Sequence, residues 1–263
     1  MEVIKYLNIN STLNLVFIAG GPGLSTDSFK ELLPLKDKYS LFFLNPMGTT
    51  TPLVKKPTYS NLITEIKSEI EKLENVILCG HSFGGIQAID IASLDLDNIK
   101  GLIAIGSPVS KNAFSILNTN FDKEVHHKEI SNKFESEPTD QAYKDWFFAY
   151  RNFYFNPSQS DELISIITND SVCVESYSEA IVESATKSDL LNKINEINIP
   201  KLFISGSIDK VMPPISAKHE ADTGGFELKI IEDAGHFVHF ERPKETISII
   251  DEFLSIRGET NED

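Results

Sequence analysis

The sequence predicts an α/β fold: a mostly parallel central sheet flanked by helices, with a helical cap inserted into it. Two observations carry this prediction. Short apolar strands alternate with helices near both ends of the chain, as they do in parallel sheets built from strand–helix–strand units. Between Ser107 and about Ile197 the alternation stops, and helical patterns follow one another. We therefore expect residues 1–106 and 198–263 to form the core and residues 107–197 to form the cap.

The first half of the core contains two apolar strands that each run into a loop. Leu13–Ile18 leads into the glycine-rich loop Gly20–Gly23, and Leu41–Leu44 leads into a loop that begins at Asn45. A phosphate-binding loop requires Gly-Lys-Ser or Gly-Lys-Thr after its glycines. Neither sequence follows this loop, so we do not expect it to bind phosphate.

A further strand leads into a Gly-x-Ser-x-Gly motif. Asn75–Cys79 is typical of a short buried strand, Gly80-His81-Ser82-Phe83-Gly84 follows it, and Gly85–Ala92 has the small and apolar residues of a helix. Strand, sharp turn and helix form the context of a nucleophile elbow, which exposes the hydroxyl of its central serine. The flanking glycines avoid a collision with neighbouring backbone. Ser82 is therefore the predicted nucleophile, and His81 is interpreted as a packing residue.

The second half of the core contains the partners that a serine nucleophile needs. A serine hydroxyl requires a histidine to accept its proton and an acid to orient that histidine. Asp209 lies in a polar loop after the apolar strand Pro200–Ile204, and His236 follows the strand Phe226–Ile231. The order serine, acid, histidine is that of hydrolases with a nucleophile elbow. We therefore predict that Ser82, Asp209 and His236 form a catalytic triad.

Two alternative triad members stay open at this point. Asp233 lies on the same loop as His236, and His239 follows His236 by three positions. Asp209 is favoured because Asp233 is too close to His236 along the chain. His239 stands just before the closing helix Pro243–Ile256, where a packing role is expected.

These motifs together resemble those of the α/β-hydrolase fold superfamily. The matching pieces are Gly20-Gly21-Pro22-Gly23, the elbow around Ser82, the Asp209 loop and Ala234-Gly235-His236-Phe237, and the resemblance extends nearly from end to end. It implies that backbone N–H groups of Gly21 and Phe83 form an oxyanion hole, because Pro22 has no N–H to donate. The fold hosts many reactions, so it does not specify a substrate.

The glycine-rich loop is similar to that of prolyl aminopeptidase-like hydrolases, with two departures. Those proteins read His-Gly-Gly-Pro-Gly, whereas Ala19 stands in the histidine position here. Their next loop begins with an aspartate, which is Asn45 in this chain. The departures predict loops that are less tightly hydrogen-bonded, and they weaken the transfer of peptidase activity.

The cap supplies the candidate substrate-binding residues. Aromatic residues crowd its middle, among them Trp146 and Tyr150, and they are expected either to pack the cap against the sheet or to line an apolar pocket. Glu175 and Glu179 lie one turn apart on a predicted helix. The resemblance implies that cap acids of this kind bind a substrate's ammonium group, whereas a solvated helix face is the alternative. The cap helices are expected near residues 122–135, 139–153, 160–168 and 172–186.

Composition narrows the possible partners and compartment. The net charge of −15 disfavours binding to nucleic acid and to anionic membranes. The two cysteines, Cys79 and Cys173, do not suggest a disulfide framework, so a reducing cytoplasm is expected. We expect a monomer or homodimer that needs no metal or organic cofactor.

The expected function is hydrolysis of a small ester, thioester or amide through an acyl-enzyme, with a small-molecule acyl compound as substrate. A prolyl aminopeptidase-like peptidase is the second possibility. A lyase or a ligand-binding member of the fold is the third.

Overall fold

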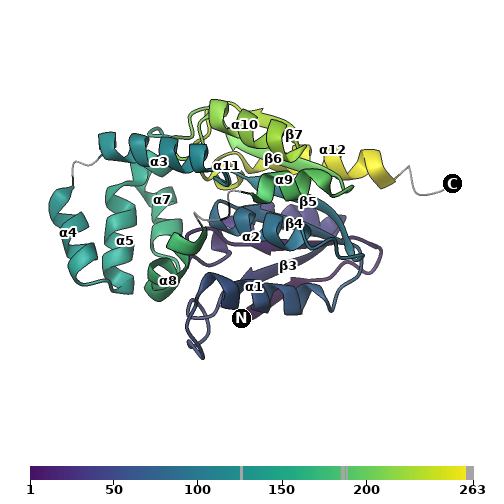
Figure 1. The fold of residues 1–263 in the computed structure, drawn as a ribbon, viewed down its shortest axis with the longest axis horizontal. Helices are drawn as coiled ribbons and strands as arrows, with labels where there is room; N and C mark the ends of the chain where they lie inside the picture. The colour runs from purple at the N-terminus through teal and green to yellow at the C-terminus, as the bar shows by residue number, and fades with distance from the viewer. Residues whose placement is uncertain (125–126, 185–186, 188, 259–263) are drawn as a thin grey trace.

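The computed structural model describes residues 1–124, 127–184, 187 and 189–258. Seven strands form one sheet in the order β1-β3-β2-β4-β5-β6-β7, of which β3 to β7 are labelled in Figure 1. Their bounds are Glu2–Tyr6, Asn14–Ile18, Ser40–Asn45, Val76–His81, Ile99–Ile105, Lys201–Gly206 and Glu227–Ile231 for β1 to β7. β1 is antiparallel to β3, and every other pair is parallel. The predicted α/β fold with a mostly parallel sheet is thus confirmed.

Helices cover both faces of this sheet, which explains why several of its strands are buried along their whole length. β3, β4 and β6 are buried at every position. One face packs against α1 (Tyr59–Ile70), α2 (Phe83–Ala92), α9 (Leu190–Glu196) and α10 (Pro214–Gly224). The other face packs against the 3₁₀ helix η1 (Asp27–Asp37), α11 (Val238–Glu241) and α12 (Pro243–Gly258).

The remaining helices follow β5 and precede α9 along the chain. They are α3 (Lys111–Glu124), α4 (Lys128–Ser136), α5 (Asp140–Ala149), α6 (Arg151–Tyr154), α7 (Asp161–Thr168) and α8 (Val174–Ser184). In Figure 1, α4, α5, α7 and α8 form the end of the molecule beyond the sheet. Within the described part of 107–197, no segment joins the sheet, and the residues form one isolated bridge, Leu24 to Val172. α9 packs on α2 and α10, and the exact cap boundary stays a prediction.

Local capping sets where several of these helices begin. Thr139 accepts a hydrogen bond from the N–H of Ala142 at the start of α5, and Ser160 accepts one from Leu163 at the start of α7, as N-cap residues do. The helix expected over 139–153 is divided at Tyr150, whose backbone leaves helical geometry. Parts of the helices expected over 122–135 and 172–186 fall at residues 125–126 and 185–186, outside the described residues.

Candidate active site

Ser82 stands at the turn between β4 and α2 with an unusual backbone conformation. Its φ is 51° and its ψ is −118°, a region that residues with a side chain rarely adopt and that marks functional turns. Close backbone contacts make glycine necessary around it. A Cβ at Gly80 would lie 2.3 Å from the carbonyl oxygen of Gly84, and a Cβ at Gly84 would lie 2.2 Å from that of Ile18. The Gly-x-Ser-x-Gly sequence thus folds as the strand–turn–helix that its pattern predicts.

Asp209 and His236 form a buried pair beside this turn. His236 Nδ1 lies 2.9 Å from Asp209 Oδ2, and because a carboxylate oxygen accepts, the ring nitrogen donates. The other carboxyl oxygen accepts hydrogen bonds from the N–H groups of Val211 at 2.8 Å and Met212 at 2.9 Å. These bonds fix the carboxylate, and the carboxylate in turn fixes the tautomer of the histidine.

The alternative acid and base lie elsewhere. Asp233 is exposed, and its N–H donates to Ser207 Oγ. His239 is fully buried, and its Nε2 is bonded to Ser28 Oγ at 3.0 Å. Burial and the neighbouring His236 lower the pKa of His239 to about 3, so this ring stays neutral. The pair that the structure brings together is therefore Asp209 and His236.

A cavity of about 50 Å³ lies over the turn. Its described lining residues are Gly21, Leu24, His81, Ser82, Tyr143, Trp146, Phe147, Tyr154, Tyr177, His236 and Phe237. The cavity thus brings together Ser82, His236, Gly21 and Trp146 from the predicted site. No hydrogen bond is recorded between the described side chains of Ser82 and His236, and in unliganded hydrolases such contacts are often long.

Gly21 and Phe83 are the two residues predicted to supply N–H groups to an oxyanion hole, and of these Gly21 lines the cavity. Gly21 has a φ of 111°, a conformation that favours glycine. Phe83 is the first residue of α2, so its N–H has no acceptor within the helix. The ring of Phe83 packs away from the cavity, edge-on to Tyr59 at 5.8 Å between centroids.

The side chain of Asn45 makes more hydrogen bonds than its sequence position suggested. Its Oδ1 accepts from both the N–H and the hydroxyl of Thr26, at 2.8 and 2.7 Å. Its amide nitrogen donates to Glu2 Oε2 at 3.1 Å. The expectation of a loosely bonded loop at Asn45 is therefore wrong, because the amide oxygen accepts these bonds as a carboxylate oxygen would.

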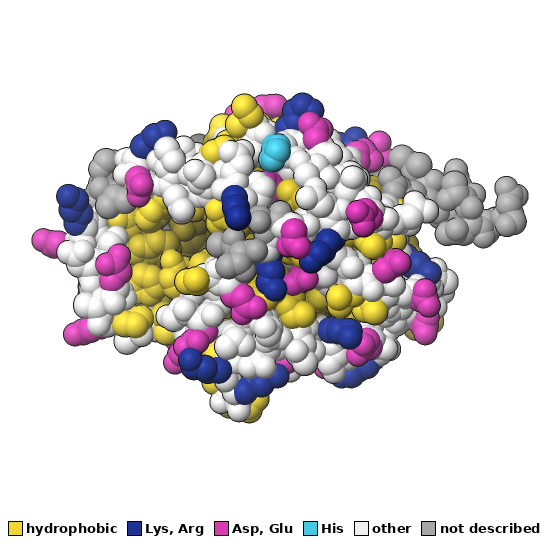
Figure 2. All heavy atoms as spheres, viewed as in Figure 1, with side chains coloured by type: hydrophobic (Ala, Val, Ile, Leu, Met, Phe, Trp, Pro, Cys, Tyr) yellow, Lys and Arg dark blue, Asp and Glu magenta, His cyan; other side chains and the backbone are white. Residues whose placement is uncertain are grey.

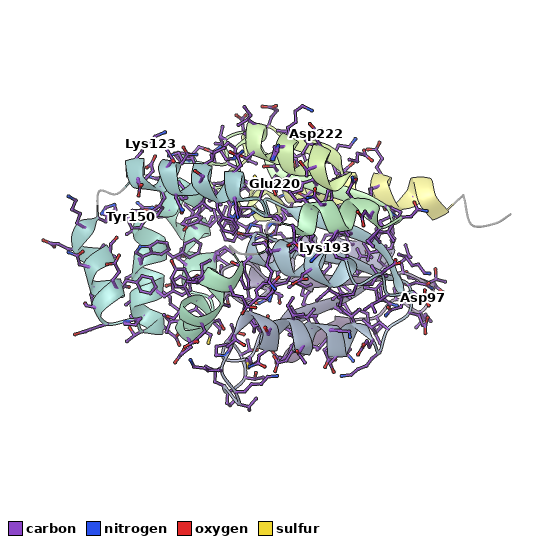
Figure 3. The ribbon with its side chains drawn as sticks, in the orientation of Figure 1. Asp97, Lys123, Tyr150, Lys193, Glu220 and Asp222 are labelled. Carbon is purple, nitrogen blue, oxygen red and sulfur yellow. The ribbon has the colours of Figure 1, made fainter. Side chains whose placement is uncertain are left out.

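The other three candidate substrate-binding residues do not line the cavity over Ser82. Tyr150 is buried among the helices beyond the sheet (Figure 3), with its hydroxyl 2.8 Å from Ser131 Oγ. Glu175 is exposed. Glu179 forms an ion pair with Lys56 at 2.9 Å.

Several lining residues were not among the predicted site residues. Tyr143 and Phe147 share a helix face with Trp146 and therefore had a signal in the sequence, namely their helical spacing. The hydroxyl of Tyr143 donates to the carbonyl of Pro22 at 3.1 Å, which ties the aromatic wall to the glycine-rich loop. Tyr177 and Phe237 had no such signal, because their positions depend on how distant segments pack.

Backbone contacts also fix the loop that carries His236. Its N–H donates to the carbonyl of Tyr154 at 2.6 Å, and its carbonyl accepts from His81 Nε2 at 3.1 Å. Burial, together with His239 and His236 nearby, lowers the pKa of His81. The ring of His81 therefore stays neutral and acts as a hydrogen-bond donor within the packing.

The described residues contain no group of three or more His, Cys, Asp or Glu side chains that could hold a metal ion. Cys79 and Cys173 are buried free thiols. In the part of the chain that the structure describes, every helix is too short or too polar to cross a membrane.

The fold and the geometry at Ser82 agree with comparisons of the sequence with known families. Residues 15–249 match the profile of the α/β hydrolase family, and the chain belongs to this family. Among solved structures, a thermophilic esterase from Thermogutta terrifontis superposes with a TM-score of 0.76 and 17% identity, covering 97% of this chain and 92% of that one. At this identity the likeness establishes the fold alone.

Curated relatives differ in the activity that their names give. A candidate "esterase/lipase 2" of Mycoplasma genitalium is 26% identical over 92% of this chain and 89% of its own length. A proline iminopeptidase of Saccharolobus solfataricus is 23% identical over 93% of this chain and 85% of its own. A 2-succinyl-6-hydroxy-2,4-cyclohexadiene-1-carboxylate synthase of Klebsiella pneumoniae is 23% identical over 68% of each chain.

Proposed function

We propose that this protein is a serine esterase that hydrolyses small uncharged esters or thioesters through an acyl-enzyme on Ser82. The observation that carries the proposal is the wall of the cavity over Ser82. Among the described residues that line it, none is Asp, Glu, Lys or Arg, and most are aromatic. A wall without charges favours an uncharged acyl group, because a charged group buried there would have no partner.

In the proposed mechanism, His236 Nε2 takes the proton of Ser82 Oγ as that oxygen bonds to the substrate's carbonyl carbon. The negative charge on the carbonyl oxygen is held by the N–H groups of Gly21 and Phe83. His236 then gives the proton to the departing alkoxide or thiolate. Water, deprotonated by the same nitrogen, releases the acid from Ser82. Asp209 stabilises the imidazolium form of His236 in both halves.

A peptidase like the relative from Saccharolobus solfataricus is the second candidate, and the Gly-Gly-Pro-Gly loop favours it. A peptidase that trims N-terminal residues has to face the substrate's ammonium group with a carboxylate. Glu179 is instead paired with Lys56, and Glu175 is exposed. We therefore expect Glu175→Gln and Glu179→Gln to change ester hydrolysis little.

The synthase relative from Klebsiella pneumoniae makes a product whose name contains a carboxylate. Such a compound needs a cationic partner in the site, and no described residue lining this cavity is Lys or Arg. This difference favours hydrolysis of uncharged esters over a lyase reaction on an anionic substrate.

One panel of substrates separates these candidates. The purified protein is assayed with p-nitrophenyl esters, with prolyl and other aminoacyl p-nitroanilides, and by mass spectrometry of the products. We expect turnover of the uncharged esters with release of one acid and one alcohol. A preference for aminoacyl anilides that is lost in Glu175→Gln or Glu179→Gln would establish the peptidase instead.

A further inference from the structure

A second, larger cavity lies beside the one over Ser82. It has a volume of about 350 Å³ and is lined by Phe121, Ser131, Phe134, Glu135, Pro138, Trp146, Tyr177, Ser178 and Ile181. We call it the outer chamber and the cavity over Ser82 the inner cavity. In Figure 2 a hydrophobic hollow is visible at the end of the molecule that α4, α5 and α8 form.

The two cavities share two wall residues, Trp146 and Tyr177. Their ring centroids lie 6.3 Å apart, and each ring also packs on Phe134, at 5.6 and 5.5 Å between centroids. The two cavities therefore adjoin at Trp146 and Tyr177, and we call this pair of rings the partition.

The volumes show why the partition matters for the substrate. The inner cavity, with about 50 Å³, is the smaller of the two and has room for only a small part of a substrate. Sites for small organic ligands usually measure about 300–1,000 Å³. Of these two cavities, the outer chamber reaches that size with about 350 Å³, so we expect a longer substrate to extend into it.

The chemistry of the outer chamber defines the group that it accepts. Apolar side chains form most of its wall, with Ser131 and Ser178 as neutral polar members. Glu135 is the only charged residue among its described lining residues, and its carboxylate would repel an anionic group. An uncharged alkyl or aryl arm fits this wall best.

We propose that the outer chamber is the subsite for the apolar arm of the substrate, reached from Ser82 past the partition of Trp146 and Tyr177. This inference rests on the proposed function where it concerns ester hydrolysis, whereas binding of an apolar arm in the outer chamber does not depend on that function. The arm belongs either to the acyl group or to the alcohol, and the same chemistry holds for both. The substrate class is thus an uncharged ester with at least one alkyl or aryl arm longer than acetyl.

Binding can be tested without turnover, because Trp146 is the single tryptophan of the chain. Methyl hexyl ketone is titrated into the protein while tryptophan fluorescence is recorded. Acetone, which lacks the long alkyl arm, is the reference ligand. We expect methyl hexyl ketone to change the fluorescence at a far lower concentration than acetone does. Ser178→Phe narrows the chamber from its exposed side and should abolish that difference.

Ser178 is suited to this test because it takes no part in the catalytic machinery. It is exposed, and its hydroxyl bonds to the carbonyl of Val174 in its own helix. Ser68→Phe is the matched control, since Ser68 is also an exposed helical serine and lines neither cavity. Equal affinity for the two ketones, or equal loss in both variants, would overturn the proposal.

Turnover then identifies which arm enters the chamber. One series keeps p-nitrophenol and lengthens the acyl group from acetate to octanoate, and the other keeps acetate and lengthens the alcohol. We expect kcat/KM to rise up to about fourfold per methylene in one series, and Ser178→Phe to flatten that rise while Ser68→Phe preserves it. If p-nitrophenyl acetate were hydrolysed but kcat/KM did not depend on chain length in either series, the proposed role of the outer chamber would be contradicted, while the proposed esterase function would stand. If the protein bound methyl hexyl ketone, Ser178→Phe abolished this binding and no ester was hydrolysed, the outer chamber would be supported and the proposed esterase activity would be contradicted.

Discussion

Ser82, Asp209 and His236 follow the carboxyl ends of parallel strands, and we call this end of the sheet the proposed catalytic edge. It meets the aromatic wall at the cavity over Ser82, but different contacts specify the residues of the two regions. At the edge, a side chain at Gly80 or Gly84 would press on backbone atoms at 2.3 or 2.2 Å. In the wall, rings pack mainly on rings, as Trp146 does on Phe134 at 5.6 Å between centroids. Contacts with backbone dictate one residue type, whereas contacts between side chains require only size and apolarity. The edge therefore leaves a specific motif in the sequence, whereas the wall leaves at most a helical spacing of aromatic residues.

The largest effect is expected for the base at the catalytic edge. His236→Ala removes the proposed general base, so we expect kcat on p-nitrophenyl acetate to fall on the order of 10⁶-fold, as in a protease triad. His239→Gln is the matched variant of the rival histidine and should keep most of the activity. If His239→Gln abolished turnover while His236→Ala stayed active, the general base would be His239 and not His236.

The next effect concerns the acid. Asp209→Asn keeps the shape of the side chain but removes the charge that orients and stabilises His236, so kcat should fall about 10⁴-fold. Asp233→Asn, on an exposed position of the histidine loop, should leave kcat near that of the unmodified protein. The comparison fails if the two variants lose activity to the same extent.

Stability measurements test the contrast between backbone and side-chain contacts. In Gly84→Ala the new methyl group meets the carbonyl oxygens of Ile18 and Ala19 at 2.2 and 2.3 Å, so the free energy of unfolding should fall by about 1–3 kcal/mol or more. In Gly101→Ala the closest contact of the new methyl group is the end of the Ile77 side chain at 3.0 Å, and the nearest backbone atom, the carbonyl oxygen of Pro200, lies at an ordinary 3.5 Å. This substitution should change the free energy of unfolding by less than about 1 kcal/mol.

Behind the wall, Phe155 is buried and packs on the wall residues Phe147 and Phe237. Phe155→Leu keeps an apolar side chain there, and we expect the free energy of unfolding to fall by less than about 1.5 kcal/mol. Urea denaturation of all three variants supplies the values. A larger loss for Phe155→Leu than for Gly84→Ala would reverse the comparison.

A smaller, pH-dependent effect is expected at the seam between the two regions. Asp170 accepts a hydrogen bond from the Ser25 hydroxyl near the glycine-rich loop, and burial raises its pKa from 3.8 to about 6. Between about pH 4 and 6 the folded protein therefore binds more protons at this carboxyl than the unfolded chain does, so its contribution to the free energy of unfolding falls as pH rises.

Asp170→Asn removes this titratable group, so the variant lacks the fall in stability that the group causes in the unmodified protein. The free energy of unfolding of the variant, relative to that of the unmodified protein, should therefore increase between about pH 4 and 6. Urea denaturation at several pH values measures the difference, with Asp97→Asn at an exposed position as the control. A difference that stays constant with pH would show that Asp170 does not titrate in this way.

The sequence alone predicted the elements of the catalytic edge because each has a local signal. The elbow glycines, the order of Ser82, Asp209 and His236, and the apolar strands before them are all visible in the chain. The 2.9 Å contact between Asp209 and His236 follows from parallel strands that end at the same edge. The antiparallel pairing of β1 with β3 had no comparable signal.

The wall was harder to predict because it depends on packing between segments far apart in sequence. Tyr177 lies on the same helix as Glu175 and Glu179, yet only the tyrosine lines the inner cavity. Which face of α8 turns inward is decided by its contacts with other elements, such as α1. Asn45 differed from expectation for another reason: its amide makes three hydrogen bonds that depend on Thr26 and Glu2.

The most direct test of the central claim is to find which atom a fluorophosphonate modifies. The unmodified protein and Ser82→Ala are treated with the probe, and the adduct is located by peptide mass spectrometry. We predict one adduct, on Ser82, together with loss of esterase activity, and neither labelling nor turnover in a folded Ser82→Ala protein. An adduct on another serine, or full ester hydrolysis by Ser82→Ala, would contradict the account.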